Sequence, residues 1–112
     1  MNEQDVLKSA LAQLFALFAK LESQKNESIS EGARCAIDCA SDSLKDRIEY
    51  LNEFNEDTPT EQLIEFKSEI ESLIIVLESD IEDAGESQID VDFKNTMSEI
   101  LKEVYSIQNK LS

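Results

Sequence analysis

Cys35 and Cys39 are the side chains whose type and spacing most invite chemistry, because thiolates bind metals, form disulfides and act as nucleophiles. Their spacing puts both on one flank of a helix, where nearly parallel side chains make a strained disulfide. A single pair without histidine completes no tetrahedral metal site within one chain, although two copies of the chain would bring four thiolates together. We interpret the two cysteines as small structural residues.

An acidic turn in the third quarter of the chain invites comparison with a calcium-binding loop. If Asp80 takes position one, Glu82 and Gly85 fall at positions three and six, as such a loop requires. Ala84 and Val91 then stand at positions five and twelve, where oxygen ligands are needed. We therefore predict no specific calcium site, only weak binding of divalent cations to the concentrated charge.

Histidine is absent from the chain, as is tryptophan. Without histidine there is no Ser-His or Cys-His nucleophile arrangement, and the commonest general base is missing. The Glu-x-x-His motifs of di-iron helical bundles cannot occur either. These absences predict a protein that is not an enzyme and that binds neither a metal nor another cofactor.

The net charge of −15 is concentrated in one segment of the sequence. Residues 49–92, here called the anionic block, hold fifteen carboxylates and a single cation, Lys67, whereas the rest of the chain holds ten acids and nine bases. Such a surface repels nucleic acid and anionic membranes and attracts basic proteins. The residues that we expect to bind a partner are Glu49, Glu53, Asp57, Glu61, Glu65, Glu69, Glu78, Glu82, Asp83 and Glu86.

The charge pattern predicts a noncatalytic, acidic interaction module that docks on a basic protein surface. Carboxylates on rigid helices can compete with a phosphate backbone for lysine and arginine, as nucleic-acid mimics, inhibitors, and antitoxin or immunity proteins do. The expected partner is a basic protein, such as a nucleic-acid-binding protein or a nuclease. The alternative is a small helical dimerisation or assembly protein whose acidity serves only solubility. Ile64 and Ile75, three turns apart on one line, are either incidental or a small contact surface.

Positioning these residues requires four helices, for which the sequence has clear signals. Two glycines and one proline, with apolar residues at helical spacing, favour an all-α domain over residues 1–112. Helices are expected at residues 3–24, 29–54, 59–84 and 91–111, in an antiparallel up-down-up-down bundle. The starts follow from cap residues at Asn2, at Ser28 with Glu31, at Thr58-Pro59-Thr60-Glu61, and at Asp90 or Asp92. Gly85 is expected to end the third helix in a left-handed conformation.

Residues 10–21 (ALAQLFALFAKL) are the most apolar stretch, and we expect the other helices to enclose them. Their wide apolar arc also allows the first helix to form a homodimer. Gly32, Ala36 and Ala40 on the second helix predict a close approach by another helix. Phe15 and Phe18 would fill the space opposite those alanines, or would border a cavity for a small ligand there.

The beginning of the chain predicts a cytoplasmic protein that does not enter membranes. Met-Asn-Glu-Gln-Asp carries acidic residues where a signal peptide carries lysine or arginine. The apolar run is also shorter than the ~20 residues that span a bilayer.

Overall fold

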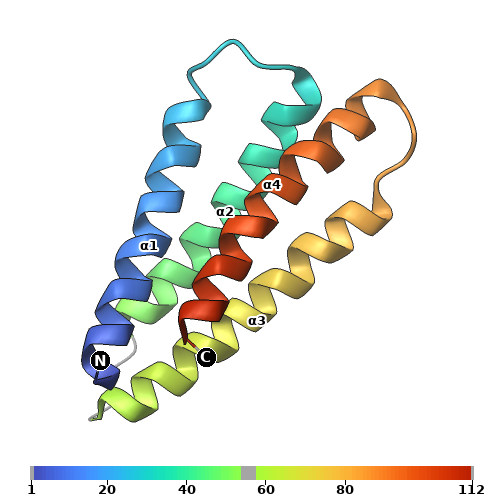
Figure 1. Cartoon of the computed structure of the whole chain (residues 1–112). Helices are drawn as coiled ribbons and strands as arrows, with labels where there is room; N and C mark the ends of the chain where they lie inside the picture. The colour runs from blue at the N-terminus through green and yellow to red at the C-terminus, as the bar shows by residue number, and fades with distance from the viewer. Residues whose placement is uncertain (1, 54–57, 112) are drawn as a thin grey trace.

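The computed structural model describes residues 2–53 and 58–111, and this part of the chain forms four helices. They are α1 (Glu3–Gln24), α2 (Glu31–Glu53), α3 (Pro59–Asp83) and α4 (Gln88–Leu111). Figure 1 shows successive helices running in opposite directions, with each pair joined at alternate ends of the molecule. The predicted all-α, antiparallel, up-down-up-down four-helix bundle is therefore confirmed.

The caps of α1 and α3 follow from the local sequence. The side chain of Asn2 accepts a hydrogen bond from the backbone N–H of Asp5 at 2.9 Å. Thr58 Oγ1 likewise accepts from the backbone N–H of Glu61 at 3.2 Å, and Pro59 occupies the first helical position. Each cap satisfies a backbone donor that has no partner within its helix, so both starts agree with the signals in the sequence.

The starts of α2 and α4 differ from the prediction. Ser30, not Ser28, caps α2, because its Oγ accepts the backbone N–H three residues later at 3.2 Å. Ser87 caps α4 by accepting the backbone N–H of Asp90 at 3.2 Å and donating its hydroxyl to the Asp90 carboxylate at 2.8 Å. This reciprocal cap starts α4 at Gln88, three residues before the predicted residue 91.

The end of α3 also differs from the prediction. Its C-cap is Ala84, whose φ of −71° and ψ of 145° are extended. Gly85 does not adopt a positive φ. Because the chain leaves α3 in an extended conformation and then enters the Ser87 cap, a left-handed residue is not needed at this turn.

The closest packing in the bundle is between α2 and α4, which make the most extensive contact of any helix pair. Ala36 and Ala40 are fully buried, and a Cβ on Gly32 would lie 2.1 Å from the carbonyl oxygen of Ile89. Only small residues allow the two backbones to come so near. The predicted close approach on α2 is therefore present, and the helix that makes it is α4.

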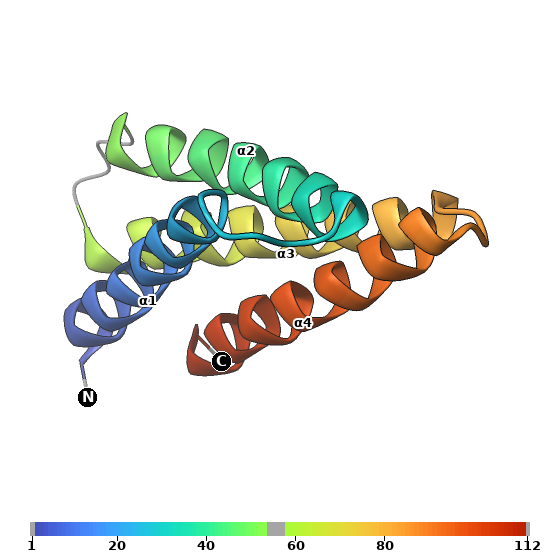
Figure 2. The same ribbon diagram turned by 90° about the horizontal axis from the view of Figure 1, so that it is seen from above.

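The prediction that the other helices enclose residues 10–21 is wrong. Among the described residues α1 buries four, fewer than α2, α3 or α4. Phe15 is 41% exposed, so it does not fill the space opposite the alanines of α2. Figure 2 shows α1 at one corner of the bundle, beside α2. Neither α1 nor any other helix in the described ranges has the length and apolar character needed to cross a membrane.

Candidate protein-interaction surface

The described residues of the anionic block lie on the end of α2, on α3, in the turn after α3 and on the first turn of α4. Six carboxylates of the predicted partner-binding set have exposed side chains: Glu49, Glu53, Glu61, Glu82, Asp83 and Glu86. Asp57, another predicted contact, lies outside the described residues. Most of the exposed carboxylates of the predicted set therefore lie on α3 and in the turn that follows it.

Glu65 and Glu69 are half-buried and face α2. The hydroxyl of Tyr50 donates a hydrogen bond to Glu65 Oε1 at 2.7 Å. Glu69 Oε2 lies 3.9 Å from Nε of Arg47, whose guanidinium also donates to the hydroxyl of Ser72 at 3.0 Å. These contacts hold α3 against α2, so the two carboxylates form the flank of the candidate surface and not its centre.

Glu78 is half-buried on the opposite flank of α3, where it faces α4. The hydroxyl of Tyr105 donates a hydrogen bond to Glu78 Oε1. This hydrogen bond and, to a smaller extent, burial raise the pKa of Tyr105 above the ordinary value for a tyrosine. The sequence pattern along α3 did not distinguish Glu65, Glu69 and Glu78 from the exposed glutamates, because their partners are on other helices.

The carboxylates of the anionic block have few cationic partners. Within residues 2–53 and 58–111, the only ion pair that involves the block is Arg47–Glu69, at 3.9 Å. The other three ion pairs join residues outside the block. Apart from Arg47, no cation in these ranges forms an ion pair with a carboxylate of the block, although Lys67 lies on α3.

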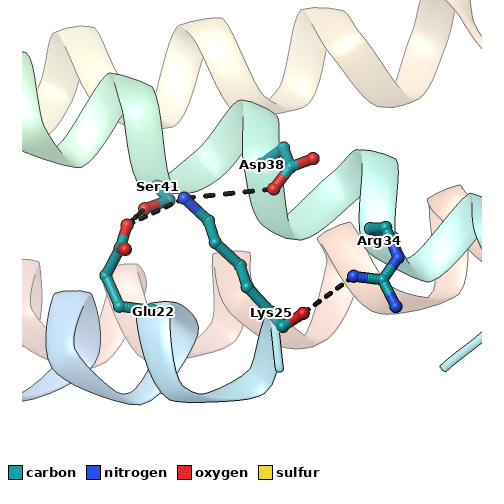
Figure 3. A network of polar contacts seen from close by, with 5 residues as sticks. All are labelled: Glu22, Lys25, Arg34, Asp38 and Ser41. Atoms are coloured by element: carbon teal, nitrogen blue, oxygen red, sulfur yellow. Dashed lines mark hydrogen bonds and ion pairs between the residues drawn. The ribbon is translucent and has the colours of Figure 1, made fainter. Parts of the chain in front are cut away.

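Cations in the first half of the chain, in contrast, are used to join α1 to α2, as Figure 3 shows. Lys25 Nζ lies 2.8 Å from Glu22 and 3.9 Å from Asp38, and the hydroxyl of Ser41 donates a hydrogen bond to Glu22. Arg34 donates to the backbone carbonyl of Lys25 at 2.7 Å. The ammonium of Lys25, followed by the Ser41 hydroxyl, lowers the pKa of Glu22.

The outward face of α3 also carries two exposed apolar side chains. Ile64 and Ile75 are 62% and 67% exposed, more than any other large hydrophobic residue in the described ranges. Lys67, Ser68 and Glu71 lie between them along the helix and are exposed as well, and Glu61 and Glu82 are exposed on either side. This part of α3 is therefore an acidic helix face with two isolated apolar positions.

Both cysteines lie on α2. Cys35 and Cys39 are both exposed and free. Loss of solvation and the nearby carboxylate of Asp80 raise the pKa of the Cys39 thiol, which reduces the fraction present as the reactive thiolate. Among the described residues, no three His, Cys, Asp or Glu side chains converge in a way that could hold a metal ion.

A surface groove of about 380 Å³ lies between α1, α2 and α4. Apolar side chains including Leu21, Ile37 and Ile100 line it, and the Lys20–Glu103 ion pair, with a separation of 2.8 Å, borders it. Neither Phe15 nor Phe18 lines this groove. It is therefore not the ligand cavity between those phenylalanines and the alanines of α2 that the sequence suggested.

Comparison with protein-family models, with curated proteins and with solved structures finds no match to this chain. The candidate surface therefore rests on the charges, exposure and contacts of the chain itself.

Proposed function

We propose that this protein is a noncatalytic interaction module that docks on a basic protein surface through the anionic block. The observation that carries the proposal is that the block's described carboxylates are almost unpaired with cations. Among the described residues, the block's only ion-pair partner is Arg47, at 3.9 Å from Glu69. A partner that supplies lysines and arginines would provide the missing positive charge. The partner class is a nucleic-acid-binding protein or nuclease, whose basic surface normally meets phosphates.

The packing of α3 supports this proposal. One side of α3 is held to the core by buried residues that include Leu63, Phe66 and Leu73. Hydrogen bonds to Glu65 and Glu78 tie its two flanks to α2 and α4. The exposed carboxylates between these flanks are thus attached to a fixed helix. A fixed array of carboxylates loses little conformational entropy on binding, and its negative charge increases the association rate with a basic partner.

The state of the cysteines supports a cytoplasmic location as part of this proposal. Cys35 and Cys39 are free and exposed. Exposed thiols persist in reducing compartments, whereas oxidising compartments favour disulfides.

The experiment captures proteins from a lysate of the native cells at physiological ionic strength with three baits. One bait is the unchanged chain. The second, the block variant, neutralises four exposed carboxylates of the anionic block: Glu61→Gln, Glu82→Gln, Asp83→Asn and Glu86→Gln. The third, the control variant, neutralises four exposed carboxylates elsewhere: Glu27→Gln, Glu31→Gln, Asp42→Asn and Glu99→Gln.

We expect a basic protein that is enriched by the unchanged chain and by the control variant and is lost with the block variant. The purified pair should bind at least about tenfold more weakly after the block substitutions, since four rim pairs at about 0.4 kcal/mol each total about 1.6 kcal/mol and a tenfold change in Kd corresponds to about 1.4 kcal/mol. Retention of the same partner by the block variant, or no basic partner at all, would refute the proposal.

A second candidate function, self-assembly through α1, is favoured by the exposure of Phe15. This side chain is 41% exposed and shares the outward face of α1 with the exposed Ala12, Ala16 and Ala19. Small residues let a second helix approach closely, and this face lies outside the anionic block. Light scattering over a range of protein concentrations tests it. A dimer that Phe15→Ser converts to a monomer supports assembly, and a monomer at all concentrations excludes it.

A further inference from the structure

The outward face of α3 has an apolar component that charge alone does not explain. Ile64 and Ile75 are 62% and 67% exposed. They are separated by three helical turns, which is about 16 Å at ~1.5 Å per residue. Aliphatic side chains on a fixed helix can enter a partner's pockets, which is how a few residues dominate the affinity of many interfaces.

The residues around the two isoleucines determine what kind of partner fits them. Exposed Glu61 and Glu71 lie one turn before Ile64 and Ile75 respectively, and exposed Glu82 lies two turns after Ile75. Between the isoleucines the exposed side chains include Ser68 and Glu71, with the cation Lys67 beside them toward α4. Ser68 is short, so a second backbone can approach α3 between the apolar positions. The face therefore complements a helix that is positively charged and carries two matching apolar residues.

We infer that the outward face of α3 binds a basic amphipathic helix whose two apolar anchors, eleven residues apart, pack on Ile64 and Ile75. This inference rests on the proposed function and specifies the partner's chemistry. The spacing follows from the geometry of helices, because a partner helix aligned with α3 repeats the same rise per residue. The glutamates attract a basic helix at long range. The isoleucines favour those basic helices whose two apolar residues are eleven positions apart.

The experiment measures binding of the full chain to two synthetic lysine- and arginine-rich helical peptides by fluorescence anisotropy. The first peptide has leucines at positions i and i+11. The second has the same composition, with the second leucine moved to i+9, which turns it to the opposite side of the helix. Four proteins are compared: the unchanged chain, the double variant Ile64→Ser/Ile75→Ser, the control Ile89→Ser, and the block variant defined above. Ile89 is 46% exposed and lies on α4.

We expect the unchanged chain and the Ile89→Ser control to bind the i+11 peptide at least about tenfold more tightly than the i+9 peptide. The double variant should bind the two peptides equally, with the salt dependence of its affinity unchanged because no charge is altered. Circular dichroism should show that all four proteins are equally helical, since the substituted side chains are exposed.

Equal binding of both peptides by the unchanged chain would overturn the inference. If that binding is also lost in the block variant, charge-driven docking survives without the apolar anchors. Binding of neither peptide would likewise overturn the inference, and the lysate capture would then decide separately whether the proposed function stands. Retained preference in the double variant would place the anchors elsewhere on the chain and refute the assignment.

Discussion

Replacement of Gly32 with alanine is expected to destabilise the bundle, although alanine is the better helix former. An added Cβ would lie 2.1 Å from the carbonyl oxygen of Ile89 and 2.9 Å from Cβ of Asp92, so α2 and α4 would have to separate. The closest atom belongs to the backbone and cannot rotate away. Overpacking of this kind costs about 1–3 kcal/mol, and we expect the upper end here. The gain in helix propensity is at most about 1 kcal/mol.

The expected net loss is therefore about 2 kcal/mol in the free energy of unfolding. Urea denaturation followed by circular dichroism measures it, and with slopes of about 1–3 kcal/mol per molar the midpoint should fall by about 0.7–2 M. Gly85→Ala is the matched comparison, because its Cβ would meet only the side-chain carboxylate of Asp90, at 2.8 Å. That carboxylate can rotate, at the cost of its hydrogen bond from Ser87, so we expect a loss of no more than about 1 kcal/mol. An unchanged or higher midpoint for Gly32→Ala would refute the close packing of α2 on α4.

Three further predictions concern single side chains. Lys25 lowers the pKa of Glu22 in the folded protein. The ionised Glu22 carboxylate therefore stabilises the fold above the pKa that it has in the unfolded chain, and this stabilisation is lost as the pH falls through the pKa of the folded state. Glu22→Gln should lower the urea midpoint at about pH 7, and the difference in midpoint between the two proteins should disappear on acidification. The raised pKa of Tyr105 should fall toward its ordinary value in Glu78→Ala, as followed by NMR titration of the tyrosine ring; an unchanged titration would contradict the hydrogen bond. Leu44 is fully buried, so Leu44→Ala should cost about 2–5 kcal/mol in urea unfolding, and a smaller loss would indicate a loosely packed core.

Local signals predicted the caps of α1 and α3, whereas the caps of α2 and α4 are Ser30 and Ser87, neither of which was among the predicted caps. Ser30 is the same residue type as Ser28, so the residue type alone does not choose between them. Arg34 decides between them in the folded protein, because its guanidinium binds the backbone carbonyls of Lys25 at 2.7 Å and Glu27 at 3.2 Å. These bonds hold the connection outside the helix. Arg34 also binds a segment seven to nine residues away, and a search for helix caps does not consider contacts of that kind.

The candidate surface was predictable in part. The position of the charge in the sequence is sufficient to predict an acidic α3, and the exposure of Glu61 and Glu82 agrees with that expectation. The roles of Glu65, Glu69 and Glu78 were not predictable. They lie at spacings no different from those of their neighbours, and only the placement of α2 and α4 supplies Tyr50, Arg47 and Tyr105 as their partners.

The sequence by itself determined the helices, their antiparallel order and the concentration of negative charge in residues 49–92, because each depends on residues near one another in the chain. The tertiary structure decided which helices pack most closely. Residues 10–21 are the most apolar, yet α2 and α4 make the most extensive contact. The physical reason is that helix packing depends on how closely two surfaces approach. Gly32 and the buried alanines of α2 permit an approach that the larger side chains of α1 do not.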